Sequence, residues 1–432
     1  MRGLLERLLK SKFIHNTGWI MFAQIYQMLL SLVIGVISAR YLGPSNYGTI
    51  NYAASYISFF TIACALGLEG IVVKEMVDHR DKEGVVLGSS IIMRLAAGFL
   101  SIIAVCIIVA VVNPGDRTLL LVAFLQSLVL LFNAFHIIDT WYQSYLRSKT
   151  STIIKCIAYT GMSVYRVWLL ISGKSVEWFA FATSLDALII AVLFVIKYTK
   201  DGSQKIRFSR SVSRYLIGLS YHLIISYLMA AVYNQMDRLM IGKIIGQTHV
   251  GYYAAASTIC HMWLFIPQAL ANSARPIIMG VRSNNKAIYI RRLQQLSCAI
   301  FWLGLVFAIV VTGMSHFIID VLYGSAYSEA RGPLLFMIWS TVFSAMSNAR
   351  AIWMISENKQ KYNKNILICG VAVNLMLNGM LIPMIGMNGA AFATLITELV
   401  CCFIAPYLIK ETRPYVRYMV RSLNPFKLIK SN

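Results

Sequence analysis

Residues 232–242 read VYNQMDRLMIG and place two full charges, Asp237 and Arg238, inside a segment that is otherwise mostly apolar. Apolar segments of this kind recur along the whole chain of 432 residues, of which 58% are hydrophobic and 13% are charged. About a quarter of the residues of a soluble protein are charged, so the composition excludes an ordinary soluble domain. Apolar runs of roughly 18 or more residues indicate transmembrane helices, and the charged pair is predicted to lie within one of them.

The chain contains about twelve such runs, each bounded by charged residues, glycine or proline. They are 13–39, 47–73, 85–112, 118–146, 151–172, 176–198, 214–245, 249–280, 293–322, 333–356, 364–385 and 388–410. The sequence therefore predicts an all-α polytopic membrane protein.

The Lys and Arg residues behind the net charge of +22 are distributed unevenly among the connections between the predicted helices. Most Lys and Arg residues lie at the N-terminus, in the even-numbered connections and in the C-terminal tail. The odd-numbered connections hold only Arg40, Arg117, Lys174, Lys243 and Arg331. Because cytoplasmic loops retain Lys and Arg, both termini are predicted to be cytoplasmic. The basic charge also attracts anionic membrane lipid, and no nucleic-acid partner is expected.

A basic connection near 199–213 divides the predicted helices into two halves of about six helices each. We predict four segments, which are an N-terminal bundle at 1–200, a cytoplasmic basic linker at 201–213, a C-terminal bundle at 214–410 and a basic cytoplasmic tail at 411–432.

The two halves share a short pattern of one basic residue and two glycines at a constant offset. The pattern consists of Arg40, Gly43 and Gly48 after the first helix, and of Lys243, Gly246 and Gly251 after the seventh. Since an even number of helices separates them, both halves enter the membrane in the same direction. This arrangement is a parallel repeat around a central cavity, an architecture of secondary transporters.

Five arginines and five acidic residues lie inside the predicted helices and away from their outermost residues. They are Arg94, Arg166, Arg238, Arg275 and Arg350, with Glu69, Asp139, Asp186, Asp237 and Glu398. Each charge at a helix centre costs about 2.5–3.5 kcal/mol on insertion scales, so such residues face water or one another. One interpretation is a set of structural ion pairs and snorkelling ends, which fits Glu69 and Arg275 best because both are predicted to lie near a cytoplasmic end.

The other interpretation assigns these residues to transport. Arginine binds phosphate oxygens bidentately and stays charged when desolvated, so all five arginines are candidates to bind an anionic headgroup. The candidates for ion coupling are Asp186, Asp237 and Glu398. On one helix Asn234, Arg238 and Gly242 share a face, while Asp237 points elsewhere. We expect one charge of the pair to face a cavity and the other to hold a neighbouring helix.

Motifs of catalysis and of cofactor binding are missing from the sequence. The tripeptide GKS at 173–175 lacks the upstream glycine of a phosphate-binding loop, because position 168 is Trp168. The eight cysteines lie in apolar segments without metal-ligand spacing and are interpreted as small buried hydrophobes. We therefore expect no enzyme activity, no cofactor and no metal site. The energy for transport would come from a proton or sodium gradient or from the membrane potential.

Seven segments, in this order and spacing, resemble polysaccharide repeat-unit (O-antigen-type, Wzx) flippases of the multidrug/oligosaccharidyl-lipid/polysaccharide exporter superfamily. They are YLGPSNYG at 41–48, GLEGIVVKE at 67–75, NQMDRLMIG at 234–242, VGYYAAA at 250–256, LYGSAY at 322–327, NLMLNGMLIP at 374–383 and IGMNGAA at 385–391. The likeness spans 13–410, nearly the whole chain.

The resemblance implies transport of an undecaprenyl-pyrophosphate-linked oligosaccharide from the inner to the outer leaflet of a bacterial cytoplasmic membrane, by alternating access. Its further implied partners are a polysaccharide polymerase and a chain-length regulator. A multidrug exporter of the same superfamily, a membrane-embedded polymerase or ligase, and a scaffold are the alternatives. For the driving force, the deep carboxylates favour a proton carried by Glu398 or Asp186, and the potential acting on the headgroup is the alternative.

Overall fold

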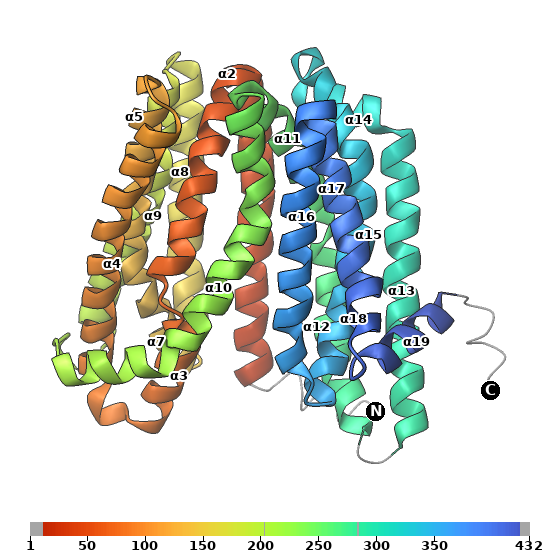
Figure 1. Ribbon diagram of the computed structural model, residues 1–432. Coiled ribbons are helices and arrows are strands. Elements are labelled where there is room, and N and C mark those ends of the chain that lie inside the picture. Colours follow the sequence, from red (N-terminus) through yellow and green to blue (C-terminus); the bar gives the residue numbers. More distant parts are fainter. Residues whose placement is uncertain (1–11, 203, 283–284, 424–432) are drawn as a thin grey trace. The chain divides into compact units, whose positions relative to one another are not determined.

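The computed structural model describes residues 12–202, 204–282 and 285–423, and these form helices and connections without a β-strand (Figure 1). The chain divides into two compact units. Unit 1 contains the chain up to Leu42 and Thr49–Ala231, and unit 2 contains Gly43–Gly48 and the chain from Val232. The predicted all-α architecture is confirmed.

The helices of unit 1 are, in chain order, α2 (Lys12–Cys64), α3 (Leu68–Asp78), η1 (Arg80–Lys82), α4 (Glu83–Val112), α5 (Arg117–Ser127), α6 (Val129–Phe132), η2 (Asn133–His136), α7 (Ile137–Ser144), α8 (Ser148–Ile171), α9 (Val176–Asp201) and the first part of α10 (Arg210–Ile244).

Unit 2 contains the rest of α10 and then α11 (Gln247–Trp263), α12 (Phe265–Val281), α13 (Lys286–Gly313), α14 (Ser315–Tyr323), η3 (Ser325–Ala330), α15 (Arg331–Ser356), η4 (Gln360–Tyr362), α16 (Asn363–Ile385), α17 (Met387–Leu399), the π-helix η5 (Val400–Ile404), α18 (Ala405–Leu408) and α19 (Arg413–Ser422).

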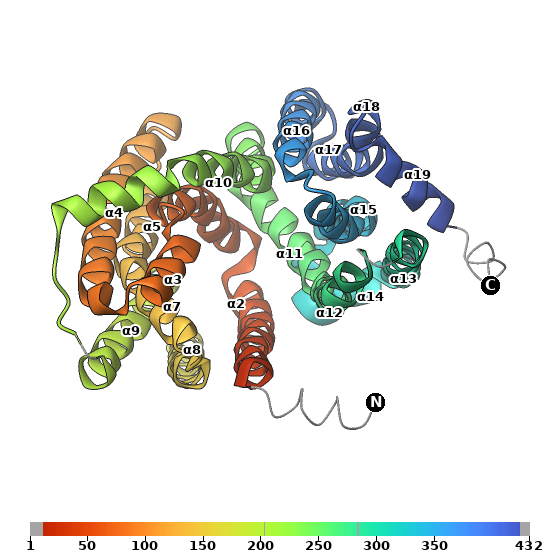
Figure 2. The same ribbon diagram turned by 90° about the horizontal axis from the view of Figure 1, so that it is seen from below.

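Nine segments of the described chain are long and apolar enough to cross a membrane, so the protein is a multi-pass membrane protein. The predicted number of about twelve spans stays a prediction. Two of the predicted spans are merged in α2, where the chain reverses at Gly43 (φ +70°). In unit 2, α15 packs against α11, α13 and α17, as the view along the helices shows (Figure 2).

The repeated glycines have the same structural roles in the turn at 43–48 and in the turn at 246–251. Gly43 and Gly246 both have positive φ, +70° and +100°, which a residue with a side chain rarely adopts. Gly48 and Gly251 let the two turns touch within unit 2. A Cβ atom on Gly48 would lie 1.9 Å from the Gln247 carbonyl oxygen, and one on Gly251 would lie 2.1 Å from that of Pro44. The sequence repeat is thus a pair of turns that need small residues in order to pack together.

The linker after α9 packs on unit 1, and the unit boundary falls later, between Ala231 and Val232 inside α10. The Arg207 amide donates to the Gly84 carbonyl (3.0 Å), and the Gly84 amide donates to Gln204 Oε1 (3.1 Å). A Cβ on Gly84 would lie 2.4 Å from the Lys205 carbonyl oxygen. The second residue of α4 is therefore glycine, because the linker backbone lies directly on it.

Replacing Gly84 by valine should detach the linker from α4. The new side chain would overlap the linker backbone, which is fixed by hydrogen bonds on both sides of the contact, so a loss of about 1–3 kcal/mol is expected. Limited proteolysis of the purified protein should then cut near Lys205 and Arg207 at a raised rate. The matched control is Gly161→Val, because a Cβ there meets nothing within 4 Å. Equal cleavage rates in both variants would contradict the docking.

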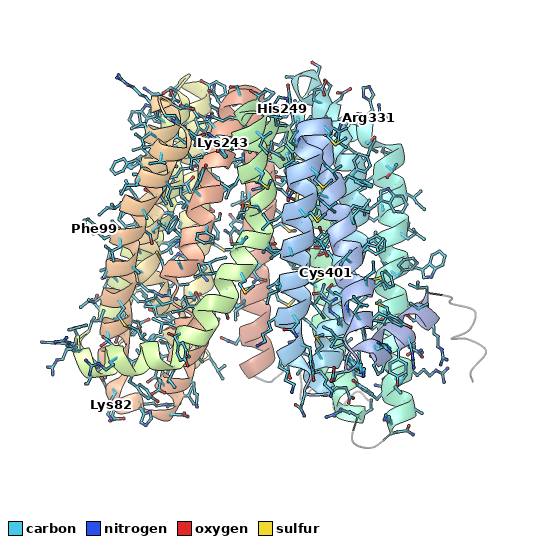
Figure 3. All side chains as sticks on the ribbon, in the orientation of Figure 1. Lys82, Phe99, Lys243, His249, Arg331 and Cys401 are labelled. Atoms are coloured by element: carbon cyan, nitrogen blue, oxygen red, sulfur yellow. The ribbon has the colours of Figure 1, made fainter. Side chains whose placement is uncertain are left out.

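Even-numbered and odd-numbered connections gather separately in unit 1. In unit 1, Gln204 donates to the Arg80 carbonyl and Arg80 lies over the Tyr145 ring (5.2 Å), which brings three even-numbered connections to one end. The Tyr41 hydroxyl donates to the Lys174 carbonyl (3.1 Å), which joins two odd-numbered connections. In unit 2, Lys243, His249 and Arg331 lie at one end and Cys401 lies between the ends (Figure 3).

Candidate functional site

Asp237 on α10 is the centre of a polar cluster in unit 2. Its Oδ1 accepts hydrogen bonds from Asn374 Nδ2 (3.1 Å) and Asn378 Nδ2 (2.6 Å), both on α16. Its Oδ2 accepts from Tyr253 (2.6 Å) on α11 and from Thr394 (2.5 Å) on α17. The carboxylate thus joins three neighbouring helices to α10, as expected for one charge of the pair. That the other charge faces a cavity stays a prediction.

All four donors to Asp237 are neutral, and the carboxylate forms no ion pair with any residue that the structure describes. The adjacent Arg238 lies on another face and donates to the Ser257 hydroxyl (3.0 Å) on α11. Asp237 is half-buried, whereas Asn374 and Asn378 are buried. A carboxylate in a membrane without a cationic partner is costly, so Asp237 is a candidate for binding an ion or a proton.

The cluster also holds an oxygen that no described group satisfies. Asn378 donates both to Asp237 and to Asn374 Oδ1 (3.0 Å), while its own Oδ1 is buried without a hydrogen-bond partner. Rotating the two amides would turn their oxygens toward the carboxylate. The cluster then offers one carboxylate, two amide oxygens and the Thr394 hydroxyl, which are oxygen ligands of the type that hard cations prefer.

The single negative charge of the Asp237 cluster limits the charge of an ion that can bind there. One carboxylate neutralises one positive charge, so the site fits a proton or a monovalent cation. Across the described chain no group of three or more His, Cys, Asp or Glu side chains could hold a metal ion. The sequence interpretation did not assign roles to Asn374, Asn378, Thr394 or Tyr253. The signal for the first two was two amides spaced i, i+4 on an apolar helix, which places them on one face.

Two further polar contacts of unit 2 lie at or beside the π-helix η5. Glu398 accepts a hydrogen bond from the Tyr233 hydroxyl (2.8 Å), and the Arg350 guanidinium donates to the Cys401 carbonyl. Arg350 is 8% exposed. A π-helix leaves backbone groups without their regular partners and is frequent at functional sites. Arg350 is thus held by a backbone carbonyl of the irregular helix, and it forms no ion pair with Glu398.

In unit 1, Arg94 on α4 reaches the break between α2 and α3. Its Nη2 donates to the Ala65 carbonyl (3.1 Å) and lies 3.5 Å from Glu69 Oε1. The expectation that Glu69 lies near a helix end on the cytoplasmic side is wrong, because the helix resumes and continues to Asp78. Nine further residues at 1.5 Å each place Glu69 about 14 Å from that end.

The other predicted residues are more isolated. Arg166 and Asp186 lie on the packed helices α8 and α9 of unit 1, and the Asp186 Oδ1 is buried without a hydrogen-bond partner in the described chain. Arg275 on α12 has a buried Nε without such a partner. Asp139 pairs with Lys155 on α8 (2.6 Å).

The five arginines divide between the units, with Arg94 and Arg166 in unit 1 and the remaining three in unit 2. Arg94, Arg238 and Arg350 donate to three different groups. That they line one cavity and bind one headgroup stays a prediction. All eight cysteines are free and five of them are buried, which fits their interpretation as small hydrophobes.

Sequence comparisons place these features among known families. The family described as polysaccharide biosynthesis protein matches residues 13–278, and the MatE family matches residues 223–380. The second match contains Asp237, Asn374 and Asn378.

Two curated relatives are similar along most of their length. The probable low-salt glycan biosynthesis flippase Agl15 of Haloferax volcanii is 23% identical over 82% of this chain and 75% of its own. The capsular polysaccharide biosynthesis protein CapF of Staphylococcus aureus is 19% identical over 92% of this chain and 99% of its own.

Among solved structures, the lipid II flippase MurJ in an inward closed conformation is similar with a TM-score of 0.71. The identity is 14%, over 93% of this chain and 90% of that one. This likeness shows a shared fold, in which a chain of membrane helices forms two helical units.

Proposed function

This chain belongs to the polysaccharide biosynthesis protein family, and from that premise we propose that it is a flippase for a lipid-linked glycan precursor. The proposed substrate is an undecaprenyl-pyrophosphate-linked oligosaccharide. The proposed reaction is its movement from the cytoplasmic to the outer leaflet of a bacterial cytoplasmic membrane, for assembly of a surface polysaccharide. The family match over 13–278 carries this proposal, and a relative named as a probable glycan biosynthesis flippase supports it.

The buried charges support transport as the task. A flippase must carry a polar headgroup through a membrane, and polar groups at that depth are expensive unless they serve a substrate or an ion. Arg94, Arg166, Arg238, Arg275 and Arg350 are proposed to bind the anionic headgroup during its passage, since guanidinium groups bind phosphate bidentately.

We assign the coupling ion to the Asp237 cluster. Asp186 and Glu398 were also candidates, yet Asp237 alone among the three carboxylates accepts hydrogen bonds from three neighbouring helices at once. A proton or a monovalent cation bound there would change how α10, α16 and α17 are held together. Binding would therefore bias one arrangement of unit 2 over another, which is what coupling requires.

The function can be tested in cells that assemble a surface polysaccharide and from which this protein is depleted. Spheroplasts are treated with an added glycan-modifying enzyme that cannot cross the membrane. With the protein present, the lipid-linked oligosaccharide should be modified. After depletion it should accumulate and stay unmodified until the cells are lysed. Unchanged access of the enzyme after depletion would rule out the flippase proposal.

The orientation of the protein gives a second test. A reporter that is active only outside the cytoplasm should stay silent when fused after Lys430, because the basic loops are proposed to face the cytoplasm. The same reporter inserted after Lys174, in an odd-numbered connection, should be active and serves as the matched control. Activity of the C-terminal fusion would reverse the orientation or change the number of spans.

A further inference from the structure

A cavity of about 210 Å³ lies inside unit 1, beside α4 and between two interrupted helices. One interruption is at Leu66 and Gly67, which have positive φ of 53° and 62°. The other is the 3₁₀ segment η2, which packs against α4. Irregular backbone at membrane depth occurs where it lines a cavity or is buried in protein. Interrupted helices of transporters mark binding sites for substrates and ions.

Arg94 is the group in this cavity that most clearly points to a ligand. Its side chain is buried, with 3% of the residue exposed. One of its amino groups is used for Ala65 and Glu69, but its Nε is buried and has no hydrogen-bond partner among the described residues. Leaving a buried donor of a charged group unsatisfied costs about 1–3 kcal/mol or more, so this donor is available to an acceptor that enters the cavity.

The N-terminus of α3 adds partial positive charge beside the same cavity. The helix begins at Leu68 after Gly67 and has no side-chain cap. Helix N-termini carry partial positive charge and bind phosphate-like anions. Glu69 occupies the first turn and supplies a negative charge, but its side chain is 67% exposed and its contact with Arg94 is 3.5 Å long. Such an exposed and long ion pair is weak, and an anion can displace it.

We propose that this cavity binds a phosphate-type oxyanion through Arg94 and the N-terminus of α3, with Glu69 as an internal competitor. Asn133 and His136 on η2 also line the cavity and offer further polar groups. Pockets for drug-sized ligands measure about 300–1,000 Å³. The cavity is smaller than this range, so it admits a phosphate or pyrophosphate group and excludes a sugar chain. Its source is either free phosphate or the phosphate of a lipid-linked headgroup, and the second source rests on the proposed function.

The test measures binding of inorganic pyrophosphate to the full-length protein in nanodiscs of neutral lipid, by calorimetry at constant ionic strength. The wild-type protein should bind with saturation. Glu69→Gln removes the competing carboxylate while keeping its shape, so binding should tighten about tenfold. Arg94→Lys keeps the charge but loses the planar fork, so binding should weaken about tenfold. Arg94→Ala should abolish saturable binding.

The matched control is Arg117→Ala, which removes an exposed arginine of the same unit outside the cavity. Its affinity should equal that of the wild-type protein. Because Arg94→Ala can also disturb folding, the opposite shifts of Glu69→Gln and Arg94→Lys decide the matter. Absence of saturable binding in the wild-type protein, or equal affinity in these two variants, would overturn the proposal.

A competition arm identifies the source of the anion. A polyprenyl pyrophosphate is added to the nanodisc before the titration. If it displaces inorganic pyrophosphate from the wild-type protein but not from the background sites that remain in Arg94→Ala, the cavity binds the headgroup of a lipid. If inorganic pyrophosphate still binds with the same affinity, the cavity binds the free anion. Either result supports an oxyanion site, and neither depends on whether the protein moves glycans.

Discussion

Replacing Asp237 by asparagine should remove the dependence of transport on its coupling ion. Asparagine has nearly the same shape and can still accept from Asn374 and Asn378, so the fold should persist. It lacks the single negative charge that neutralises a bound cation. Charge-assisted hydrogen bonds contribute about 1.5–3 kcal/mol. The apparent affinity for the coupling ion should therefore fall roughly 10–100-fold.

The measurement is glycan-lipid transport in vesicles in which the sodium gradient and the pH gradient are varied separately. The wild-type rate should respond to one of them, and Asp237→Asn should respond to neither. The matched control is Asp320→Asn on helix α14, which should behave like the wild-type protein. If Asp237→Asn keeps the wild-type response, the coupling site lies elsewhere. In that case Glu398→Gln and Asp186→Asn are the next variants to measure.

Replacing Gly251 by alanine should destabilise unit 2 strongly, although it adds only one methyl group. The added Cβ would lie 2.1 Å from the Pro44 carbonyl oxygen, and the two turns cannot separate without breaking their shared contact. Overpacking of this kind costs about 1–3 kcal/mol, and a clash with backbone belongs at the upper end. For a unit of this size, the midpoint of thermal unfolding should fall by roughly 5–10 °C.

The midpoint is measured on the purified protein by intrinsic fluorescence. Gly48→Ala should give a similar loss, because its Cβ would meet the Gln247 carbonyl oxygen from the opposite turn. Gly280→Ala is the control, since its Cβ meets nothing within 4 Å. An unchanged midpoint in Gly251→Ala would mean that the two turns are not in contact.

The helical architecture and the repeat could be predicted because they depend on local patterns. Long apolar runs indicate membrane helices directly, and the glycines at 43 and 246 indicate turns that need positive φ. The break at Leu66 was not visible, because a leucine in the left-handed region is an exception that only its surroundings impose.

The polar centres could be predicted only in part. Asp237 and Arg94 stand out because a charge in an apolar run is rare. Their partners come from distant positions, as with Thr394 for Asp237 and the Ala65 carbonyl for Arg94. A backbone carbonyl has no sequence signature at all. The docking of the linker on Gly84 was missed for the same reason, since it depends on backbone contacts between distant segments.

The central claim is that this chain moves a lipid-linked glycan across a membrane. It is tested most directly with the purified protein in liposomes that carry a fluorescent polyprenyl-pyrophosphate oligosaccharide and an impermeant quencher outside. With the protein present, the fraction of label in the inner leaflet should become accessible to the quencher, while a labelled neutral phospholipid should stay protected. If the oligosaccharide lipid is quenched no faster than in protein-free liposomes, the claim is contradicted.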